Sequence, residues 1–154
     1  CFSDINTLIP KHLGEIYQYV GDEIVISWDI RIAIENNNCL EFFFSHKEKF
    51  KKRQNYYEDK YGLIPKFKAG LHLGKVTLVE VGDIKRDLAF HGDAINVASR
   101  IQDLCKDLDK DFLISEDVFL EIDEKNKNYH FTNMGEQALS GRRDKIFLYA
   151  LDKQ

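Results

Sequence analysis

Two polar side chains in the segment 92–100 could together bind a ligand that carries hydroxyl and phosphate groups. The segment reads Gly-Asp-Ala-Ile-Asn-Val-Ala-Ser-Arg, and Asn96 and Arg100 are four positions apart. On a helix this spacing places both side chains on one face. An amide beside a guanidinium suits phosphate and hydroxyl oxygens. An ordinary solvated helix face has the same spacing, and the spacing alone favours that simpler interpretation.

A carboxylate and a cluster of cations offer complementary chemistry elsewhere in the chain. Asp22 follows Gly21 at a tight turn, and there it could join phosphate oxygens and water around Mg²⁺. Arg142, Arg143 and Lys145 place three cations within four residues, which could hold a polyphosphate. Asp is also common in turns, and solvated loops also carry cations. Taken alone, Asp22 is better explained as a turn residue.

A histidine lies between two glycines in the segment 70–74, Gly-Leu-His-Leu-Gly. The glycines are typical of a strand end followed by a tight turn. A lone histidine in such a place is more often packed in the core than bound to a ligand. We therefore expect His72 to be a packed histidine.

The composition is that of one soluble, mildly acidic domain. The chain has 154 residues, 44% of them hydrophobic and 31% charged, with a net charge of −4. No apolar run approaches the ~20 residues of a membrane span, and the acidity argues against a nucleic-acid partner. Cys1, Cys39 and Cys105 form no CxxC pair, which fits a reducing compartment. We expect a cytoplasmic domain, in a full-length protein that could be attached to a membrane by another segment.

The periodicity predicts an alternation of helices and strand pairs that would position these groups. A two-residue hairpin turn at Gly21-Asp22 is the clearest local signal. Helices are expected over residues 2–13, from 36 to about 60, from 92 onward, and from Ser115 to 120. Strands are expected over residues 15–20, 23–28, 66–73, 75–81 with a turn at Gly74, 88–90, 112–114 and 145–151. This order indicates an α+β fold with helices on one side of a sheet.

Apolar spacing also predicts which helix faces are buried. The helix after the three asparagines at 36–38, which are expected to cap it, would bury the stripe Leu40, Phe43, Phe44 and Phe50. The helix that carries Asn96 and Arg100 would bury Ile95, Ala98, Ile101 and Leu104 or Cys105. On this pattern Asn96 and Arg100 lie on a face distinct from the core.

Taken together and in order, the motifs resemble the class III adenylate and guanylate cyclase catalytic domain. They are Tyr-Val-Gly-Asp at 19–22, Gly-Leu-His-x-Gly-x-Val at 70–76, Gly-Asp-x-x-Asn-x-x-x-Arg at 92–100 and Leu-x-Gly-Arg at 139–142. The resemblance covers residues 2–151, and the 92–100 segment is its most specific part. It implies a ferredoxin-like α+β domain over residues 1–154, with active sites at a head-to-tail homodimer interface.

The resemblance also implies an activity. Such domains convert a nucleoside triphosphate to a 3′,5′-cyclic monophosphate and pyrophosphate with two divalent ions, Mg²⁺ or Mn²⁺. Asp22 matches a metal ligand, Asn96 the residue that orients the ribose, and Arg100 the residue that stabilises charge on the reacting phosphate. Asp22 would come from one subunit, and Asn96 and Arg100 from the other.

Some positions depart from the family pattern. The purine-selecting positions carry Gln18 and Ala89, and ATP is favoured over GTP by analogy alone. Ser140 stands where many members have a triphosphate-binding Lys, so Arg142, Arg143 or Lys145 would replace it. Glu80 stands where a small residue is common.

The start of the chain is unusual, because it has no initiator Met. Phe2-Ser-Asp4-Ile5 mimics the motif of the family's other metal-binding Asp, but it belongs to a predicted helix and not to a strand. We therefore read Asp4 as a coincidence. The first strand and the second metal ligand are expected upstream, which makes this an N-terminally truncated domain.

Two alternatives remain open. The unusual Gln18, Ala89 and Ser140 are also compatible with a catalytically degenerate, cyclase-like domain that binds a nucleotide or a partner for regulation. The segment 20–24, Val-Gly-Asp-Glu-Ile, resembles the signature of diguanylate cyclases, but that family lacks the Asn-x-x-x-Arg helix. Active nucleotidyl cyclase is the favoured interpretation.

Overall fold

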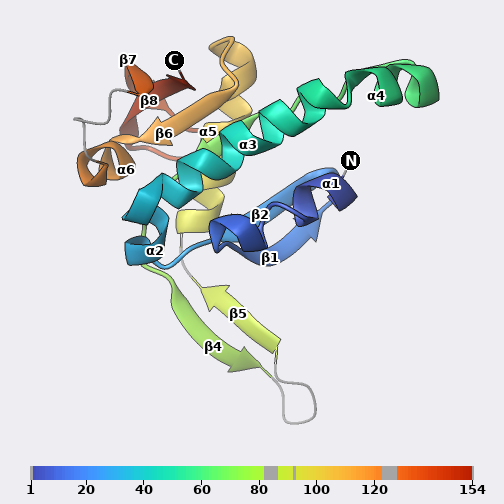
Figure 1. Cartoon of the computed structure of the whole chain (residues 1–154). Coiled ribbons are helices and arrows are strands. Elements are labelled where there is room, and N and C mark those ends of the chain that lie inside the picture. The colour runs from blue at the N-terminus through green and yellow to red at the C-terminus, as the bar shows by residue number, and fades with distance from the viewer. Residues whose placement is uncertain (1, 82–86, 92, 123–127, 154) are drawn as a thin grey trace. The chain divides into compact units, whose positions relative to one another are not determined.

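The computed structural model divides the chain into two compact units, Cys1–Phe67 and Lys68–Gln154, which are described one after the other (Figure 1). It describes residues 2–81, 87–91, 93–122 and 128–153, and of Phe2 and residues 77–91 only the backbone. No helix among these residues is long and apolar enough to cross a bilayer.

The first unit begins with two short helical segments where the sequence predicts one helix. They are α1 (Phe2–Asn6) and the 3₁₀ helix η1 (Pro10–His12). The predicted helix over 2–13 is therefore wrong in its middle. Proline has no N–H to donate and cannot continue a helix interior, and Pro10 instead opens a new turn. Ile5, Leu8 and Ile9 are buried, as their spacing predicts.

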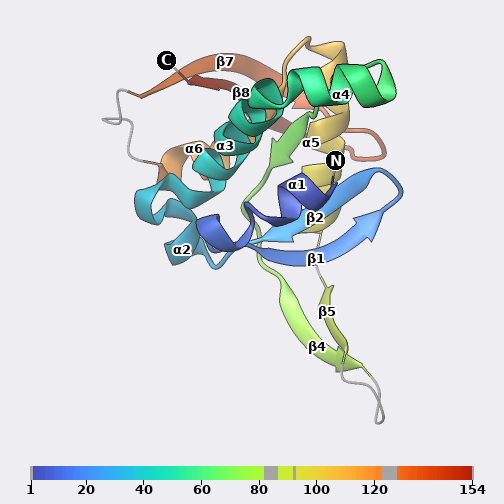
Figure 2. The same cartoon turned by 45° about the vertical axis from the view of Figure 1, so that its right-hand side comes forward.

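The predicted hairpin is confirmed. β1 (Glu15–Val20) and β2 (Glu23–Ser27) are antiparallel, and Val20 pairs with Glu23 (Figure 2). Gly21 and Asp22 therefore form a two-residue turn. Gly21 has a φ of 60°, the left-handed conformation that glycine adopts at no steric cost.

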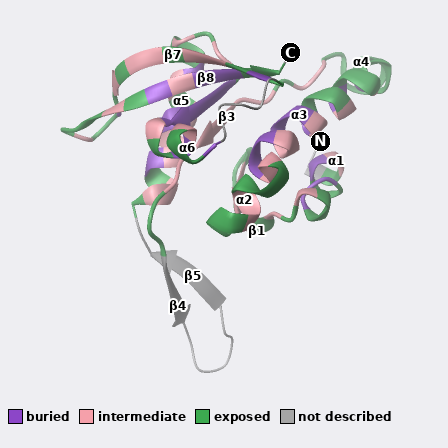
Figure 3. Ribbon diagram, turned by 60° about the vertical axis from the view of Figure 1, so that its left-hand side comes forward, coloured by how far each residue is buried: buried purple, intermediate pink, exposed green. Residues whose placement is uncertain are grey.

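Two helices, α3 (Asn38–Lys52) and α4 (Gln54–Tyr61), replace the single predicted helix from 36 to about 60, with a break at Arg53. A short helix, α2 (Ile30–Ile34), and a 3₁₀ turn, η2 (Glu35–Asn37), precede them. Asn37 precedes α3 but its side chain makes no capping hydrogen bond, so the predicted cap is wrong. The predicted stripe is confirmed: Leu40, Phe43, Phe44 and Phe50 are all buried, and Figure 3 shows buried residues in purple along α3.

The second unit contains a four-stranded mixed sheet of order β3-β6-β8-β7. The strands are β3 (Ala69–Leu71), β6 (Phe112–Ser115), β7 (Tyr129–Ala138) and β8 (Lys145–Lys153), and only β3 and β6 run parallel. A separate antiparallel pair consists of β4 (Thr77–Val81) and β5 (Asp87–His91). The predicted pairing of 66–73 with 75–81 across Gly74 is therefore wrong.

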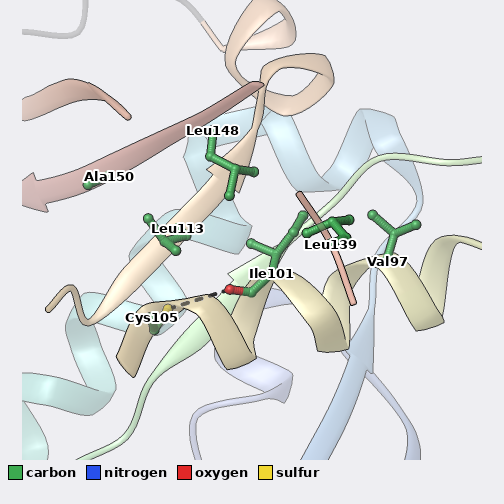
Figure 4. Close-up of a cluster of buried hydrophobic side chains, with 7 residues drawn as sticks. All are labelled: Val97, Ile101, Cys105, Leu113, Leu139, Leu148 and Ala150. Atoms are coloured by element: carbon green, nitrogen blue, oxygen red, sulfur yellow. Dashed lines mark hydrogen bonds between the residues drawn. The ribbon is translucent and has the colours of Figure 1, made fainter. Parts of the chain in front are cut away.

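Two helices complete the second unit, α5 (Ala94–Asp107) and α6 (Glu116–Glu121). α5 packs on β3 and β6, and its buried side chains are Val97, Ile101 and Cys105. The predicted stripe is thus right for Ile101 and Cys105, but it omits Val97 and includes Ile95, which is only half-buried. The core also contains Leu113, Leu139, Leu148 and Ala150 (Figure 4). The mixture of helices with mainly antiparallel strands confirms the predicted α+β class.

Candidate active site

The first half of α5 presents Asn96 and Arg100 away from the hydrophobic core. Val97 and Ile101, which each follow one of these residues, point into the core with Leu139 (Figure 4). Asn96 is exposed and Arg100 is half-buried. The prediction that the two polar side chains avoid the core face is confirmed.

Two glycines let the chain around β3 approach α5 very closely. A Cβ on Gly70 would lie 2.4 Å from the Ala98 carbonyl oxygen and 2.5 Å from the Gln102 nitrogen. A Cβ on Gly74 would lie 2.7 Å from the Cβ of Ala94. These separations are far shorter than van der Waals contact, so the Gly-Leu-His-Leu-Gly segment is needed for strand–helix packing. The sequence pattern does not indicate this role, because Gly74 resembles the turn of a hairpin.

The turn between β7 and β8 lies at the start of the same helix. The Arg142 N–H donates to the Leu139 carbonyl over 3.1 Å, and Gly141 between them has a φ of 71°. The Arg142 guanidinium donates to the carboxylate of Asp93, the residue before α5, from 49 positions away in the sequence. The turn and the helix are thereby joined by an ion pair.

The Arg100 guanidinium also lies close to this turn. Its Nη2 lies 3.5 Å, and its Cζ 3.8 Å, from the position that a Cβ on Gly141 would occupy. The structure therefore brings together two segments that are far apart in the sequence, 93–100 and 139–145. This juxtaposition was not predicted.

The three predicted phosphate-binding cations differ in their surroundings. The Arg142 side chain is 30% exposed and is paired with Asp93. Arg143 and Lys145 are both exposed, and Lys145 begins β8 opposite Ala138. Arg143 and Lys145 are thus the cations of this turn that are available to an anion.

The other predicted site residues lie on separate elements. Asp22 is exposed at the tip of the β1–β2 turn, and Gln18 is exposed in β1 opposite Val25, both in the first unit. Ala89 lies in β5 opposite Val79, and its side chain lies outside the described residues. Glu80, on β4, pairs with Leu88 and is likewise described only in its backbone.

The donor set limits which metal ions this chain could hold. In the part of the chain that the structure describes, no three His, Cys, Asp or Glu side chains are grouped to hold a metal. Mg²⁺ needs only one or two protein carboxylates when substrate phosphates and water complete its octahedron. Asp22 is exposed on a short turn. It could therefore be the one protein ligand of an ion that is otherwise bound by phosphate and water.

Asp4 is engaged by other side chains of the first unit. Its side chain is 13% exposed, and it accepts hydrogen bonds from Arg53 and Tyr57 while Lys49 lies 3.7 Å away. Burial raises the pKa of Asp4, but the hydrogen bonds from Tyr57 and Arg53 outweigh it and lower the pKa below its usual value. Asp4 therefore joins α1 to α3 and α4.

His72 and the buried cysteines have structural surroundings. His72 Nδ1 lies 2.9 Å from the Ser115 Oγ, and burial lowers the histidine pKa. His72 is thus a half-buried, packed histidine, and the Ser115 side chain makes no capping bond to α6. Burial raises the pKa of Cys39 and of Cys105 to about 11, so both thiols stay protonated.

Comparison with known proteins assigns a family to this arrangement. The family model for the adenylate and guanylate cyclase catalytic domain matches residues 1–153. Adenylate cyclase 2 of Rhizobium meliloti is 29% identical over 143 residues, which are 93% of this chain and 39% of that protein. This chain therefore spans about two fifths of that relative.

Solved structures show the same fold. A bacterial light-regulated adenylyl cyclase superposes with a TM-score of 0.80 at 21% identity, over 98% of this chain and 42% of the other. The adenylyl cyclase CyaB from P. aeruginosa gives a TM-score of 0.80 at 16% identity, over 99% of this chain and 79% of the other. The predicted class III cyclase fold is confirmed.

Proposed function

Because this chain belongs to the adenylate and guanylate cyclase catalytic domain family, we propose that it forms a nucleotidyl cyclase that converts ATP to 3′,5′-cyclic AMP and pyrophosphate. The observation that carries this proposal is the convergence of two polar segments on one side of α5. Asn96 and Arg100 are held there by a buried helix face, and the turn with Arg143 and Lys145 lies against Arg100. This combination suits a ribose joined to a triphosphate.

Each group has a distinct part in this proposal. The ribose 3′-hydroxyl attacks the α-phosphorus, pyrophosphate leaves, and negative charge grows on the α-phosphate oxygens. Asn96 hydrogen-bonds and orients the ribose, and Arg100 donates to the oxygens on which charge grows. Arg143 and Lys145 bind the outer phosphates, taking over from the lysine that Ser140 replaces. Arg142 contributes less directly, since Asp93 already binds it.

Divalent ions complete the proposed site. Asp22 would hold Mg²⁺ or Mn²⁺, and a two-ion arrangement needs a second carboxylate besides it. When bound, such ions acidify the 3′-hydroxyl and neutralise the triphosphate. The carboxylate of Asp22 lies on a turn fixed by the β1–β2 pairing, so it would meet the ion without reordering the backbone.

We propose that ATP is the substrate and that a homodimer carries the site. The relative and the two solved structures named above are all adenylate or adenylyl cyclases, which supports ATP. Gln18 can both donate and accept, so it could read the edge of adenine. In the dimer Asp22 would come from one copy, and Asn96 and Arg100 from the other.

The test measures cyclic nucleotide formed by the full-length protein from ATP or GTP with Mn²⁺. Cyclic AMP is expected to exceed cyclic GMP, with specific activity rising with protein concentration as dimers form. Asp22→Ala and Arg100→Ala should each be inactive alone. Their mixture should regain activity, because each heterodimer has one intact site. Absence of product from either nucleotide at a dimer-forming concentration would refute the proposal.

The second candidate is a regulatory domain that binds the nucleotide without turning it over. Ser140 in place of the usual lysine, and the engagement of Arg142 by Asp93, are the observations that favour it. It predicts saturable binding of ATP or GTP by calorimetry with no cyclic product. The complementation experiment separates the two, because a binding domain has no activity to regain.

A further inference from the structure

We propose that the ion pair between Asp93 and Arg142 positions Arg100, the residue that carries the phosphate chemistry in the proposed function on which this inference rests. The pair joins the start of α5 to the β7–β8 turn, and the same turn lies against Arg100. Asp93 and Arg142 are therefore positioning residues that act through Gly141.

The side chain of Asp93 does not cap the helix that it precedes. An Asp directly before a helix usually accepts a hydrogen bond from the helix N-terminus. Asp93 has helical backbone angles and its side chain makes no such bond, while its carbonyl already accepts the Val97 N–H over 3.0 Å. The carboxylate binds Arg142 instead. Helix capping therefore does not account for Asp93.

The turn is held in place on both sides of Gly141. On one side Leu139 is buried in the core beside Val97 and Ile101 (Figure 4). On the other side Arg142 is held by Asp93 and by its own N–H bond to the Leu139 carbonyl. Gly141 is thus held at a position close to the Arg100 guanidinium. Releasing Arg142 would leave the turn anchored only through Leu139.

The ion pair also changes the charge close to Arg100. Arg142 follows Gly141 directly, so two guanidinium groups are close to the same turn. With Asp93 present, Arg142 is neutralised and Arg100 remains the cation available to a phosphate. Without the carboxylate, the two cations would repel each other and compete for the same anion. An ion pair this exposed contributes little to folding stability, so its loss should affect activity more than unfolding.

The test compares substitutions in the pair with a matched control on the same helix. Asp93→Asn should lower kcat about 10- to 100-fold, the scale expected for a misplaced catalytic group, with KM and the melting temperature close to wild type. Asp103→Asn removes an exposed carboxylate from α5 and should leave kcat unchanged. Arg142→Lys keeps a cation for Asp93 and should retain more kcat than Arg142→Met. Equal loss in Asp103→Asn, or equal loss in both Arg142 variants, would overturn the proposal.

A second readout does not depend on activity. In the substrate-free protein, arginine Nε–Hε signals are followed by ¹⁵N NMR, with the Arg100 signal assigned by its loss in Arg100→Lys. Asp93→Asn should shift the Arg100 signal as well as the Arg142 signal. A shift confined to Arg142 would overturn the positioning role. A shifted Arg100 signal in a protein without cyclase activity would support the positioning role and refute the proposed function.

Discussion

The guanidinium of Arg100 lies close to Gly141, with Nη2 3.5 Å from the position that a Cβ there would occupy. A methyl group at that position would be in ordinary van der Waals contact with the guanidinium, so a larger side chain there is expected to displace it. Gly141 lies 41 residues after Arg100 in the sequence, in the turn between β7 and β8.

If the proposed cyclase function holds, Gly141→Leu should lower turnover by more than its loss of folding stability can explain. Gly135→Leu is the matched control, because Gly135 also has a φ of 71° but nothing lies within 4 Å of its Cβ position. Both changes should cost about 1–2 kcal/mol of unfolding free energy, the strain of a left-handed residue. Only Gly141→Leu should lower kcat by about tenfold or more, by displacing Arg100. Similar kcat values for the two variants would contradict this.

Gly70→Ala should destabilise the second unit strongly. The added methyl would meet the backbone of α5 at 2.4–2.5 Å, and backbone cannot move aside as a side chain can. We expect a loss of about 3 kcal/mol, at the upper end for overpacked sites. Gly62→Ala, at a φ of 68° in open space, should cost only about 1 kcal/mol. Urea unfolding of both variants measures the difference, and equal costs would argue against the close strand–helix approach.

His46 should make the stability of the first unit depend on pH. Burial lowers its pKa from 6.5 to about 4, so the folded state keeps it neutral where the unfolded state takes up a proton. Its contribution is full above pH 6.5 and falls as the pH drops toward 4, by about 3 kcal/mol in all. His46→Phe should flatten the fall in urea midpoint between pH 7 and 5. His130→Gln, at an exposed position, should leave the fall unchanged.

Asp4→Asn should destabilise the first unit by about 1–2 kcal/mol, because the neutral amide gives up charge-assisted hydrogen bonds from Arg53 and Tyr57. Burial and the bond to Asp4 raise the pKa of Tyr57 to about 12. The same variant should therefore lower the Tyr57 pKa, which ultraviolet titration of the folded protein follows. Asp59→Asn, an exposed change on α4, should leave stability and titration unchanged.

Local features of the fold could be predicted from the sequence, because their causes are local. Gly21 and Asp22 alone specify a two-residue turn between strands. Leu40, Phe43 and Phe44 alone specify which face of α3 is buried. Asn96 and Arg100 were placed away from the core for the same reason, since their helix has one apolar stripe.

Features that depend on distant partners could not be predicted in this way. Gly74 resembles a hairpin turn, but β3 pairs in parallel with β6, whose residues come after α5. β7 was missed because its alternation is interrupted by a register shift between Asn133 and Gly135. The pairing of Asp93 with Arg142 likewise has no local signal, since either residue alone is ordinary in a turn.

The parallel pairing of β3 with β6 has a consequence for how the second unit acquires its structure. Ala69 can meet Phe112 only after a loop of about 40 residues has closed around α5, and such long-range closure slows folding. The helix with Asn96 and Arg100 is packed against both strands. These side chains should therefore reach their final places only after β6 has been synthesised and has paired with β3.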